Sequence, residues 1–407
     1  MTKTLMIIGA GAEQVPAYYA AKAKGLNIVG SDMNLDAPGL ELADYKLQAS
    51  TRDPVETLQK VKELSEDIHI DGVMTIANDV PLTVATVANF LQLPSIGMDA
   101  ARNASDKHLM KKCFQEHGVA CPNFHTIHSL EDLQRVMHDT QANKKFVLKP
   151  IDGRGARGVL LITKKDDLEW AFAESLAHGS KKYLLLEEFI EGKQFSTESF
   201  LLAGKCFTAA VAERNYKNLN KFAPYIIEDG GDINYSIDSD LLGRIDDLIL
   251  EGAQAMGISD GIIKGDIVID DQGNPQIIEL AARLSGGWFA SHQIPKATGI
   301  DLISAVISFS LNEEIDQKLL IPTLKNATSI RYWYPESGKI TQIEGINSLE
   351  STPGLIKYGF FKDVGEFQNE IKMHSDRFGF VIVQATNALE CTARINEALS
   401  RIQVKVS

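Results

Sequence analysis

The stretch GDIVIDDQGNPQIIELAARLSGG, from Gly265 to Gly287, indicates two strands joined by a tight turn. We expect the strands at Asp266–Asp270 and Pro275–Ala281. The loop between them, residues 271–274, contains a Gly and an Asn, which readily adopt the positive φ of hairpin turns. The stretch therefore predicts an antiparallel hairpin.

The register of this hairpin decides whether it carries a metal site. With a four-residue loop, Asp266 is expected to pair with Glu279, and Val268 with Ile277. Cβ atoms of such pairs lie about 5 Å apart on one face, where two carboxylates repel unless a cation or proton lies between them. Two carboxylates on rigid strands suit Mg²⁺, and Arg283 follows at even spacing on the same face. The alternative interpretation is an exposed hairpin whose acids are solvated.

Length and composition set the class of protein. A chain of 407 residues exceeds what a single core supports and suggests several domains. Hydrophobic residues make up 44% and charged residues 23%, as in an ordinary globular protein. The net charge of −13 argues against a nucleic-acid partner, because phosphate neutralisation needs clustered Lys and Arg.

The same survey bears on the compartment. Apolar runs such as Ala305–Leu311 are too short to span a bilayer, so we expect no membrane association. The N-terminus shows no signal-peptide pattern, and the four cysteines show no CxxC spacing. These features predict a cytoplasmic protein.

Residues 1–95 alternate between strand and helix patterns. Alternation of this kind implies a parallel sheet with right-handed crossovers. The expected strands are Thr4–Gly9, Asn27–Ser31 and Asp71–Ile76, and the expected helices are Glu13–Lys24 and Val80–Leu91.

Gly9-Ala10-Gly11 after the first strand is a partial dinucleotide fingerprint, with Asp32 following at the usual distance. Gln14 stands in place of the third glycine, so the motif is a weak indication of NAD binding. A turn that receives some other small ligand is favoured, because helix N-termini present free N–H groups. Asn78 and Asp79 follow another strand and would lie on the same rim.

Two lysines upstream of the hairpin are candidate anion ligands. Lys107 opens the expected helix Lys107–His117, where a cation opposes the helix dipole, although a solvated side chain is the default interpretation. Lys149 is the one charged residue in the apolar strand Phe146–Pro150. Because an unpaired buried lysine is costly, a bound phosphate is favoured for Lys149.

A glycine-rich loop follows that strand. Residues Asp152–Gly158 alternate glycines with Arg154 and Arg157 and lead into the expected strand Val159–Thr163. Glycines let backbone N–H groups approach phosphate oxygens, and arginines add charge-assisted bonds. No GxxxxGK[ST] motif is present, so a Walker loop is excluded. A plain hairpin turn is the alternative.

A hinge between two strands comes next. The strongly apolar strand Lys182–Ile190 ends in Glu187 and Glu188, and an alternating strand covers Phe195–Leu202 after the turn at Gly192. Exposed backbone amide groups in such a hinge can read the edge of a purine, which the sequence alone does not demonstrate.

The ordered set of FVLKP, a Gly-rich loop, LLLEEFIEG and a two-acid hairpin ending in ELAARLSGG resembles the ATP-grasp superfamily. The leading βαβ region and the stretch Arg377–Val381 are similar to flanking domains of carboxylate–amine ligases, which include relatives of biotin carboxylase, glycinamide ribonucleotide synthetase and L-amino acid ligases. The resemblance covers essentially the whole chain. It implies an α/β fold with an N-terminal Rossmann-like parallel-sheet domain (1–95), an ATP-grasp domain of two α+β subdomains (96–320, with a lid at about 115–188) and a small C-terminal α/β domain (321–407).

The resemblance also implies roles for particular residues. Lys107 and Lys149 would contact the phosphates of ATP, and Arg283 the transferring phosphate, so Lys149 and Arg283 are the catalytic candidates. Asp266 and Glu279 match the Mg²⁺ ligands, with Mn²⁺ as an alternative ion. The further ATP contacts would be Gly153, Arg154, Gly155, Arg157, Gly158, Glu187, Glu188, Phe189, Ile190 and Gln194. The candidate substrate contacts are Gly9, Glu13, Asp32, Asn78, Asp79, Gly286 and His292.

Within this resemblance, Glu187 would accept a hydrogen bond from the adenine amino group, and the backbone of Phe189 and Ile190 would complete adenine recognition. Gln194 stands where the family commonly has a glutamate that holds the ribose hydroxyls, and Gln can still form hydrogen bonds there. Ala281 stands where an asparagine often adds a third metal ligand. This departure leaves open whether one or two Mg²⁺ ions bind.

The implied reaction is ATP-dependent ligation through an acyl phosphate that an amine then displaces. The partners would be a small-molecule carboxylate and an amine, and we expect a homodimer. The alternatives are a nicotinamide-dependent oxidoreductase that uses the N-terminal domain, and a catalytically inactive ATP-binding regulator.

The remaining segments are less informative. Phe378–Gln384 is interpreted as a core strand, and Arg377 as an ordinary surface charge. A lone His is more often structural than catalytic, which applies to His292. Further helices are expected at Leu241–Met256, Thr298–Leu311 and Ala388–Ile402. The candidates for the pocket lining after the hairpin are Trp288, Phe289, Ser291 and His292.

Overall fold

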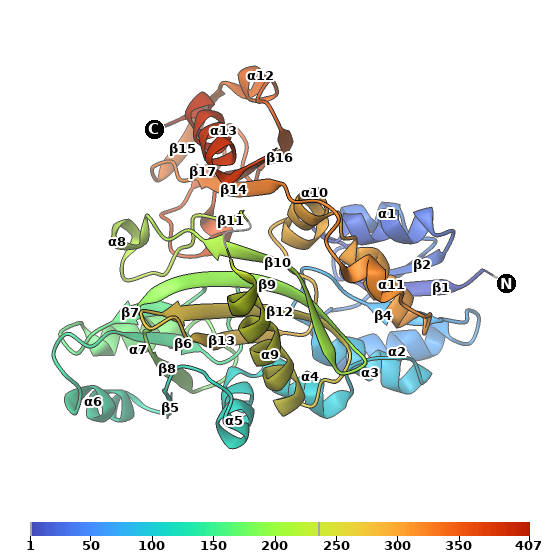
Figure 1. Cartoon of the computed structure of the whole chain (residues 1–407), viewed down its shortest axis with the longest axis horizontal. Helices are drawn as coiled ribbons and strands as arrows, with labels where there is room; N and C mark the ends of the chain where they lie inside the picture. Colours follow the sequence, from blue (N-terminus) through green and yellow to red (C-terminus); the bar gives the residue numbers. More distant parts are fainter. Residues whose placement is uncertain (1, 235–236) are drawn as a thin grey trace.

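An eight-stranded sheet runs through the middle of the protein (Figure 1). The structure is a computed structural model that describes residues 2–234 and 237–407. The strand order is β13-β12-β9-β10-β11-β14-β18-β16. The strands are β9 (Gly192–Leu202), β10 (Lys205–Arg214), β11 (Gly231–Ile233), β12 (Gly261–Asp270), β13 (Pro275–Ala281), β14 (Ala327–Trp333), β16 (Leu355–Phe360) and β18 (Gly379–Ala385).

The N-terminal part is a parallel sheet with the order β3-β2-β1-β4, as predicted. Its strand β1 is buried on both faces: Leu5 and Ile7 belong to one apolar cluster, and Met6 and Ile8 to another. Such double burial is typical of parallel sheets covered by helices. The elements are β1 (Thr4–Ile8), β2 (Asn27–Asp32), β3 (Tyr45–Gln48), β4 (Gly72–Met74), α1 (Val15–Ala23), α2 (Pro54–Leu64) and α3 (Pro81–Leu91).

A second small sheet, with the order β5-β8-β6-β7, carries the glycine-rich loop between β6 and β7. Helix α5 begins where the Asp106 carboxylate accepts hydrogen bonds from His108 N and Leu109 N, and it ends at Gly118 in the left-handed conformation. The elements are α4 (Met98–Ser105), α5 (Lys107–His117), β5 (Phe124–Ile127), α6 (Leu130–His138), β6 (Phe146–Pro150), β7 (Leu160–Ile162), α7 (Leu168–Leu176) and β8 (Leu184–Glu188).

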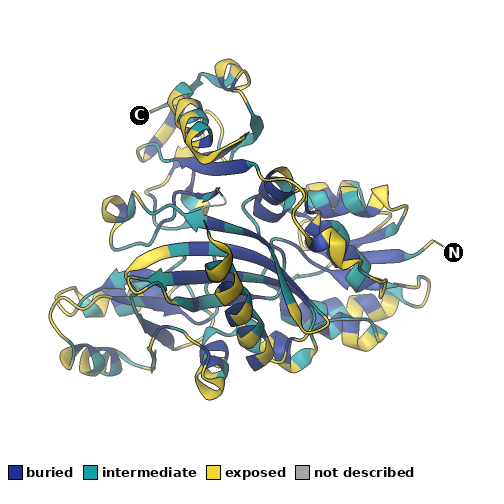
Figure 2. Cartoon of the chain, in the orientation of Figure 1, coloured by how far each residue is buried: buried dark blue, intermediate teal, exposed yellow. Residues whose placement is uncertain are grey.

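Helices and a third small sheet complete the described part of the molecule. Helix α9, which corresponds to the helix expected at Leu241–Met256, lies across one face of the central sheet and packs against β13 (Figure 1). Figure 2 shows the strands largely buried, while the peripheral helices expose one side. The elements are α8 (Leu219–Phe222), α9 (Ser239–Ala255), α10 (Ile294–Thr298), α11 (Leu302–Ser310), α12 (Ile346–Leu349), α13 (Ala388–Arg401), and the strands β15 (Gly338–Glu344), β17 (Phe367–Gln368) and β19 (Gln403–Val406) in the order β17-β15-β19.

The central hairpin departs from the predicted register at one point. Asp266 pairs with Glu279 as expected, but Ile267 pairs with Ile277 and Val268 with Gln276. The predicted pair of Val268 with Ile277 is therefore wrong, because Ile278 is an extra residue on β13 that forms a bulge. As a result Ile278 and Glu279, adjacent in sequence, both face the same cavity.

A second correction concerns the helix expected at Thr298–Leu311. The structure has two helices, because Gly299 with φ of +79° ends α10 and Asp301 caps α11 by accepting from Ser304 N. In the described part of the chain, no helix combines the length and apolarity that crossing a bilayer requires. The domain boundaries near residues 95 and 320 stay predictions.

Candidate active site

A cavity of about 420 Å³ opens where the central hairpin, the glycine-rich loop and the N-terminal sheet meet. It is lined by charged side chains from β6, β12 and β13, by residues of the hinge after β8, and by residues that follow β4 and precede β18. Residues far apart in sequence therefore share one wall. A concave site with converging ionisable groups is the usual form of an active site.

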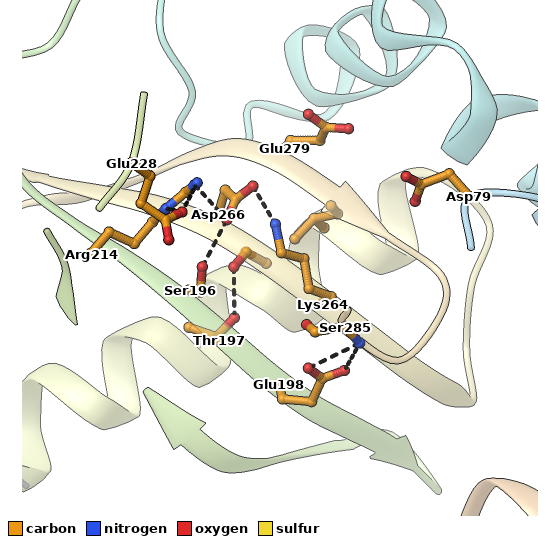
Figure 3. Close-up of polar contacts among 12 residues, drawn as sticks. Asp79, Ser196, Thr197, Glu198, Arg214, Glu228, Lys264, Asp266, Glu279 and Ser285 are labelled. Atoms are coloured by element: carbon orange, nitrogen blue, oxygen red, sulfur yellow. Dashed lines mark hydrogen bonds and ion pairs between the residues drawn. The ribbon is translucent and has the colours of Figure 1, made fainter. Parts of the chain in front are cut away.

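Asp266 lies in this cavity under the influence of two cations (Figure 3). Its carboxylate forms an ion pair with Arg214 Nη1 at 3.0 Å and another with Lys264, and it accepts from Ser196 Oγ at 3.1 Å. Burial alone would raise the pKa of Asp266, yet Lys264 and Arg214 hold it well below its usual value. The carboxylate is therefore ionised and ready to accept a cation.

Glu279 pairs with Asp266 across the hairpin and also lines the cavity. Lys107 Nζ lies 3.0 Å from its carboxylate and donates to Gly153 O at 3.1 Å. No cluster of three or more His, Cys, Asp or Glu side chains suitable for a metal occurs among residues 2–234 and 237–407. Two acidic side chains that line one open cavity nevertheless fit Mg²⁺, which takes few protein carboxylates and leaves its other positions to water and phosphate.

Lys149 is buried, and its Nζ lies 2.6 Å from Glu187 Oε2. The other carboxylate oxygen, Oε1, lies 3.2 Å from Nζ of Lys111, which in turn donates to Ile277 O at 3.1 Å. Burial would raise the pKa of Glu187, but Lys111 and Lys149 together lower it. Lys149 is thus a buried charge whose counterion is part of the fold.

Arg283 joins the hairpin to the N-terminal sheet. Its Nε donates to Asp79 Oδ1 at 2.6 Å, and next to it Ala77 N donates to Leu284 O at 2.9 Å. Burial would raise the pKa of Asp79, but the Arg283 guanidinium lowers it strongly. The Arg283 guanidinium is therefore held at the cavity wall by an acid from another sheet.

Comparison with known families identifies this arrangement. Residues 104–287 match the ATP-grasp domain family. The matched range includes the glycine-rich loop between β6 and β7, the hinge after β8 and the central hairpin. The chain contains an ATP-grasp domain. Residues 331–407 match a second family, the L-amino acid ligase C-terminal domain 2.

Curated relatives of the ATP-grasp chain are distant. The formate-dependent phosphoribosylglycinamide formyltransferase of Prochlorococcus marinus (strain MIT 9515) is 21% identical over 197 residues, 46% of this chain and 48% of the relative. The alanine–anticapsin ligase of Bacillus subtilis (strain 168) is 22% identical over 294 residues, 65% of this chain and 60% of the relative. The chain thus spans about half the length of the formyltransferase it matches.

Solved structures establish the fold over the full length. The L-amino acid ligase from Bacillus licheniformis has a TM-score of 0.84 at 21% identity, covering 100% of this chain and 99% of that one. The biotin carboxylase domain of Hydrogenobacter thermophilus 2-oxoglutarate carboxylase, in complex with MgADP, ADP and bicarbonate, has a TM-score of 0.74 at 16% identity, covering 100% and 91%. The predicted α/β fold with an ATP-grasp domain is confirmed.

The glycine-rich loop of the ATP-grasp domain lies over the cavity. Gly153, Arg154 and Gly155 line it, whereas Arg157 and Gly158 do not. The loop is both the β6–β7 hairpin turn and a cavity wall, so the two interpretations of the sequence are compatible. Its outer end is held by His374 N, which donates to Gly155 O at 3.0 Å.

The hinge after β8 also reaches the cavity. Phe189 and Ile190 line it together with Glu187, Glu188 and, on β9, Gln194. The Glu188 carboxylate accepts from Asn123 Nδ2 at 3.2 Å and pairs with Lys144. Phe189 N donates a hydrogen bond to Lys145 O at 3.1 Å. The ATP-contacting roles of these residues stay predictions.

The candidate substrate residues are divided by the structure. Asp79 and Gly286 line the cavity, whereas Gly9, Glu13, Asp32, Asn78 and His292 do not. Asp32 Oδ2 accepts from Ala10 N at 2.9 Å, so this carboxylate serves its own turn. Glu13 Oε2 accepts from Gly287 N at 2.6 Å and thereby supports the loop after Arg283.

His292 lies behind the cavity wall. Its Nδ1 is 2.8 Å from Ser291 Oγ, and its ring packs edge-on against Trp288. Burial, with Lys357 and Lys296 nearby, lowers the pKa of His292 to about 4, so the imidazole is neutral. Of the four residues proposed for the pocket lining after the hairpin, Phe289 reaches the cavity.

Sequence reasoning missed several cavity residues. Arg377, interpreted as a surface charge, is 7% exposed and lines the cavity. That interpretation is wrong because the segment before β18 packs onto β14 and the chain at Glu228. Lys111 does not line the cavity but pairs with Glu187, which does; it carried a usable signal, since it lies one helical turn after Lys107 on α5. The other missed cavity residues are Arg214, Glu228, Lys264, Tyr332 and His374.

Glu198 on β9 is a buried acid directly beneath the cavity. Both carboxylate oxygens accept from Ser285 N, at 3.0 and 3.3 Å (Figure 3). Burial raises the pKa of Glu198 to about 7, although the Ser285 bonds and Arg283 oppose the rise. The acid therefore anchors the loop that begins at Arg283.

Proposed function

We propose that the protein is an ATP-dependent ligase that activates a carboxylate as an acyl phosphate and joins it to an amine, releasing ADP and phosphate. The observation that carries the proposal is the convergence of Asp266 and Glu279 with Lys107, Lys149 and Arg283 on one cavity. Acids that hold a metal beside cations that hold phosphate oxygens are the parts that phosphoryl transfer needs.

In this proposal Asp266 and Glu279 hold Mg²⁺, or Mn²⁺ in its place. When bound, the ion neutralises charge on the nucleotide phosphates. In the structure the two acids pair with cations of the protein instead, Asp266 with Lys264 and Glu279 with Lys107. When the ion replaces Lys107 as the partner of Glu279, the lysine lies next to the phosphates, where its positive charge stabilises their negative charge.

The remaining residues position the reactants. Lys149 and the loop Gly153–Gly158 bind the phosphates, Glu187 to Ile190 bind adenine, and Gln194 binds the ribose. A substrate carboxylate oxygen bonds to the γ-phosphorus while the bond to ADP breaks, with Arg283 beside the transferring group. The amine then bonds to the acyl carbon, phosphate leaves and the nitrogen loses a proton. The closed loop keeps water from the acyl phosphate.

Support for this reaction class comes from the relatives. An alanine–anticapsin ligase matches in sequence, and an L-amino acid ligase matches in fold over the whole length. The domain division given above, a homodimer and a cytoplasmic location belong to the same proposal. Light scattering of the purified protein measures the assembly.

An ADP-release screen of carboxylate and amine pairs tests the proposal. We expect ADP to form only when ATP, Mg²⁺, a carboxylate and an amine are all present, with an amide as the other product. ADP formation that ignores both substrates, or no turnover with any pair, would contradict the ligase and favour an ATP-binding regulator. Quenching of nicotinamide fluorescence by the protein would instead favour the oxidoreductase.

A further inference from the structure

Arg377 is a buried guanidinium on the cavity wall that the proposed reaction does not use. Its side chain comes from the segment just before β18, and the residue is 7% exposed. The guanidinium carbon lies 3.7 Å from the centre of the Tyr332 ring, so the planar group is stacked on the ring. Stacking of this kind holds the fork of donors in one orientation.

The hydrogen bonds of Arg377 are incomplete. Nη2 donates to Glu228 O at 2.6 Å, but within the described part of the chain the buried Nε has no hydrogen-bond partner. A guanidinium offers five N–H donors and no acceptor. Leaving a buried donor of a charged group unsatisfied is costly, so the site calls for an oxygen acceptor.

Charge around Arg377 is unbalanced as well. The nearest acid is Glu228, whose Oε1 lies 3.9 Å from Arg377 Nη2. The carboxylate of Glu228 already accepts from Arg214 Nε at 2.8 Å, so two guanidiniums share one acid. The other acid of this corner, Asp266, is paired with Arg214 and Lys264.

The neighbouring imidazole does not correct this imbalance. His374 is buried, and burial together with Arg377 and Arg214 lowers its pKa well below the usual value, so it is neutral. Among the groups joined by these ion pairs, the three cations Arg377, Arg214 and Lys264 therefore face two acids, Glu228 and Asp266, while Glu13 and Asp229 act on Arg377 from beyond ion-pair distance. A metal ion bound to Asp266 would increase that excess.

We propose that Arg377, backed by Tyr332, binds a second substrate carboxylate, one that does not react. The inference rests on the proposed function, in which the reacting carboxylate lies beside Arg283 and the hairpin acids. A carboxylate supplies the missing acceptor and the missing negative charge, and its planar shape matches the guanidinium fork. It can come from an amine substrate that carries its own carboxylate, or from a dicarboxylic acid donor.

Two matched substrate series distinguish these sources. L-alanine, L-alaninamide and ethylamine present an amine with a free, a masked and an absent carboxylate. Succinate and propionate present an acid donor with and without a second carboxylate. ADP release by the full-length protein is measured with each member, and the KM of each member is compared with the KM of ATP.

In either the amine series or the acid series, we expect the member with the free second carboxylate to have a KM about tenfold lower than the members without it, as for a charge-assisted hydrogen bond. Arg377→Gln should raise that KM by about tenfold while the KM values of the other members and of ATP, and kcat at saturation, stay within about twofold. Arg377→Lys should lie between, because it keeps the charge without the fork. Lys339→Gln, which removes an exposed cation of the same part of the chain, is the matched control.

The proposed carboxylate subsite would be contradicted if Arg377→Gln still prefers the member with the second carboxylate, or if its KM rises equally for all members. If the wild-type protein releases no ADP with any pair, the proposed function fails separately. Calorimetric titration of the MgADP-loaded protein with L-alanine and with succinate then decides: heat lost in Arg377→Gln supports the subsite, and equal or absent heat contradicts it. Circular dichroism verifies folding, and Arg377→Lys carries the comparison if the Gln variant does not fold.

Discussion

The Nε of Arg283 lies 2.6 Å from Oδ1 of Asp79, although the two residues are 204 positions apart in the chain. One stands after the last hairpin strand, and the other follows β4 of the N-terminal sheet. The proposed phosphate ligand is thus oriented by an acid from the N-terminal part of the molecule, which also supplies Glu13 to the loop after Arg283. The N-terminal sheet completes the site rather than only flanking it.

This relationship makes Asp79 testable as a positioning residue. Asp79→Ala should lower kcat/KM for ADP release by about tenfold or more, because the Arg283 guanidinium loses the acceptor that orients it. Asp79→Asn should recover part of the loss, since its amide oxygen still accepts. The melting temperature serves as the control for folding. Wild-type kinetics in Asp79→Ala would contradict the assignment.

The hairpin acids predict a metal requirement. Glu279→Gln should abolish ATP turnover and leave the melting temperature nearly unchanged, because Gln can still accept from Lys107 but holds a metal poorly. Chelation with EDTA should stop the wild-type reaction, and added Mg²⁺ or Mn²⁺ should restore it. The metal assignment fails if Glu279→Gln releases ADP at the wild-type rate.

Lys149→Ala should weaken ATP binding by about tenfold or more, as loss of a buried phosphate ligand would. Glu187 keeps Lys111 as a counterion, so the variant should still fold. Lys112→Ala is a control, because Lys112 is an exposed lysine that pairs with the exposed Glu116 outside the cavity. Isothermal calorimetry compares the three proteins, and equal affinities would remove Lys149 from the site.

Glu198 predicts a pH dependence of stability. Burial raises its pKa from 4.5 to about 7 in the folded protein. Between these values the folded state binds more protons than the unfolded state, so the free energy of unfolding should fall as pH rises from 4.5 to 7, by about 3 kcal/mol in total. Urea denaturation at several pH values measures this slope. Glu198→Gln should flatten it, and an unchanged slope would contradict the assignment.

Local elements of the fold could be predicted closely from sequence. The bounds of Lys107–His117, Phe146–Pro150 and Pro275–Ala281 agree with the structure, because caps, turn residues and apolar patterns are short-range signals. The pairing of Asp266 with Glu279 was predictable for the same reason. The bulge at Ile278 was not, since an extra residue on one strand leaves no mark in composition.

The composition of the site was harder to predict. The order of the motifs predicted which lysines and acids lie at the site. The ion-pair partners of these side chains, such as Glu187 for Lys149, could not be predicted from sequence spacing. Arg377 and Tyr332 approach each other only because β14 and β18 pair across the sheet. A contact that depends on tertiary packing gives a lone arginine no distinguishing local signal, so the sequence alone predicts a surface charge at Arg377.

Strand β14 hydrogen bonds to β11 and so continues the sheet that carries the hairpin. The segment after residue 326 is therefore a fixed part of the cavity wall, because its strands are hydrogen bonded into the central sheet. Removing this segment would leave β11 as an exposed edge strand, whose unpaired backbone groups can pair with other chains and promote aggregation. To alter selectivity, this segment could be exchanged between related enzymes. Such an exchange should transfer β14 and β18 together, so that the two strands stay paired and Arg377 stays stacked on Tyr332.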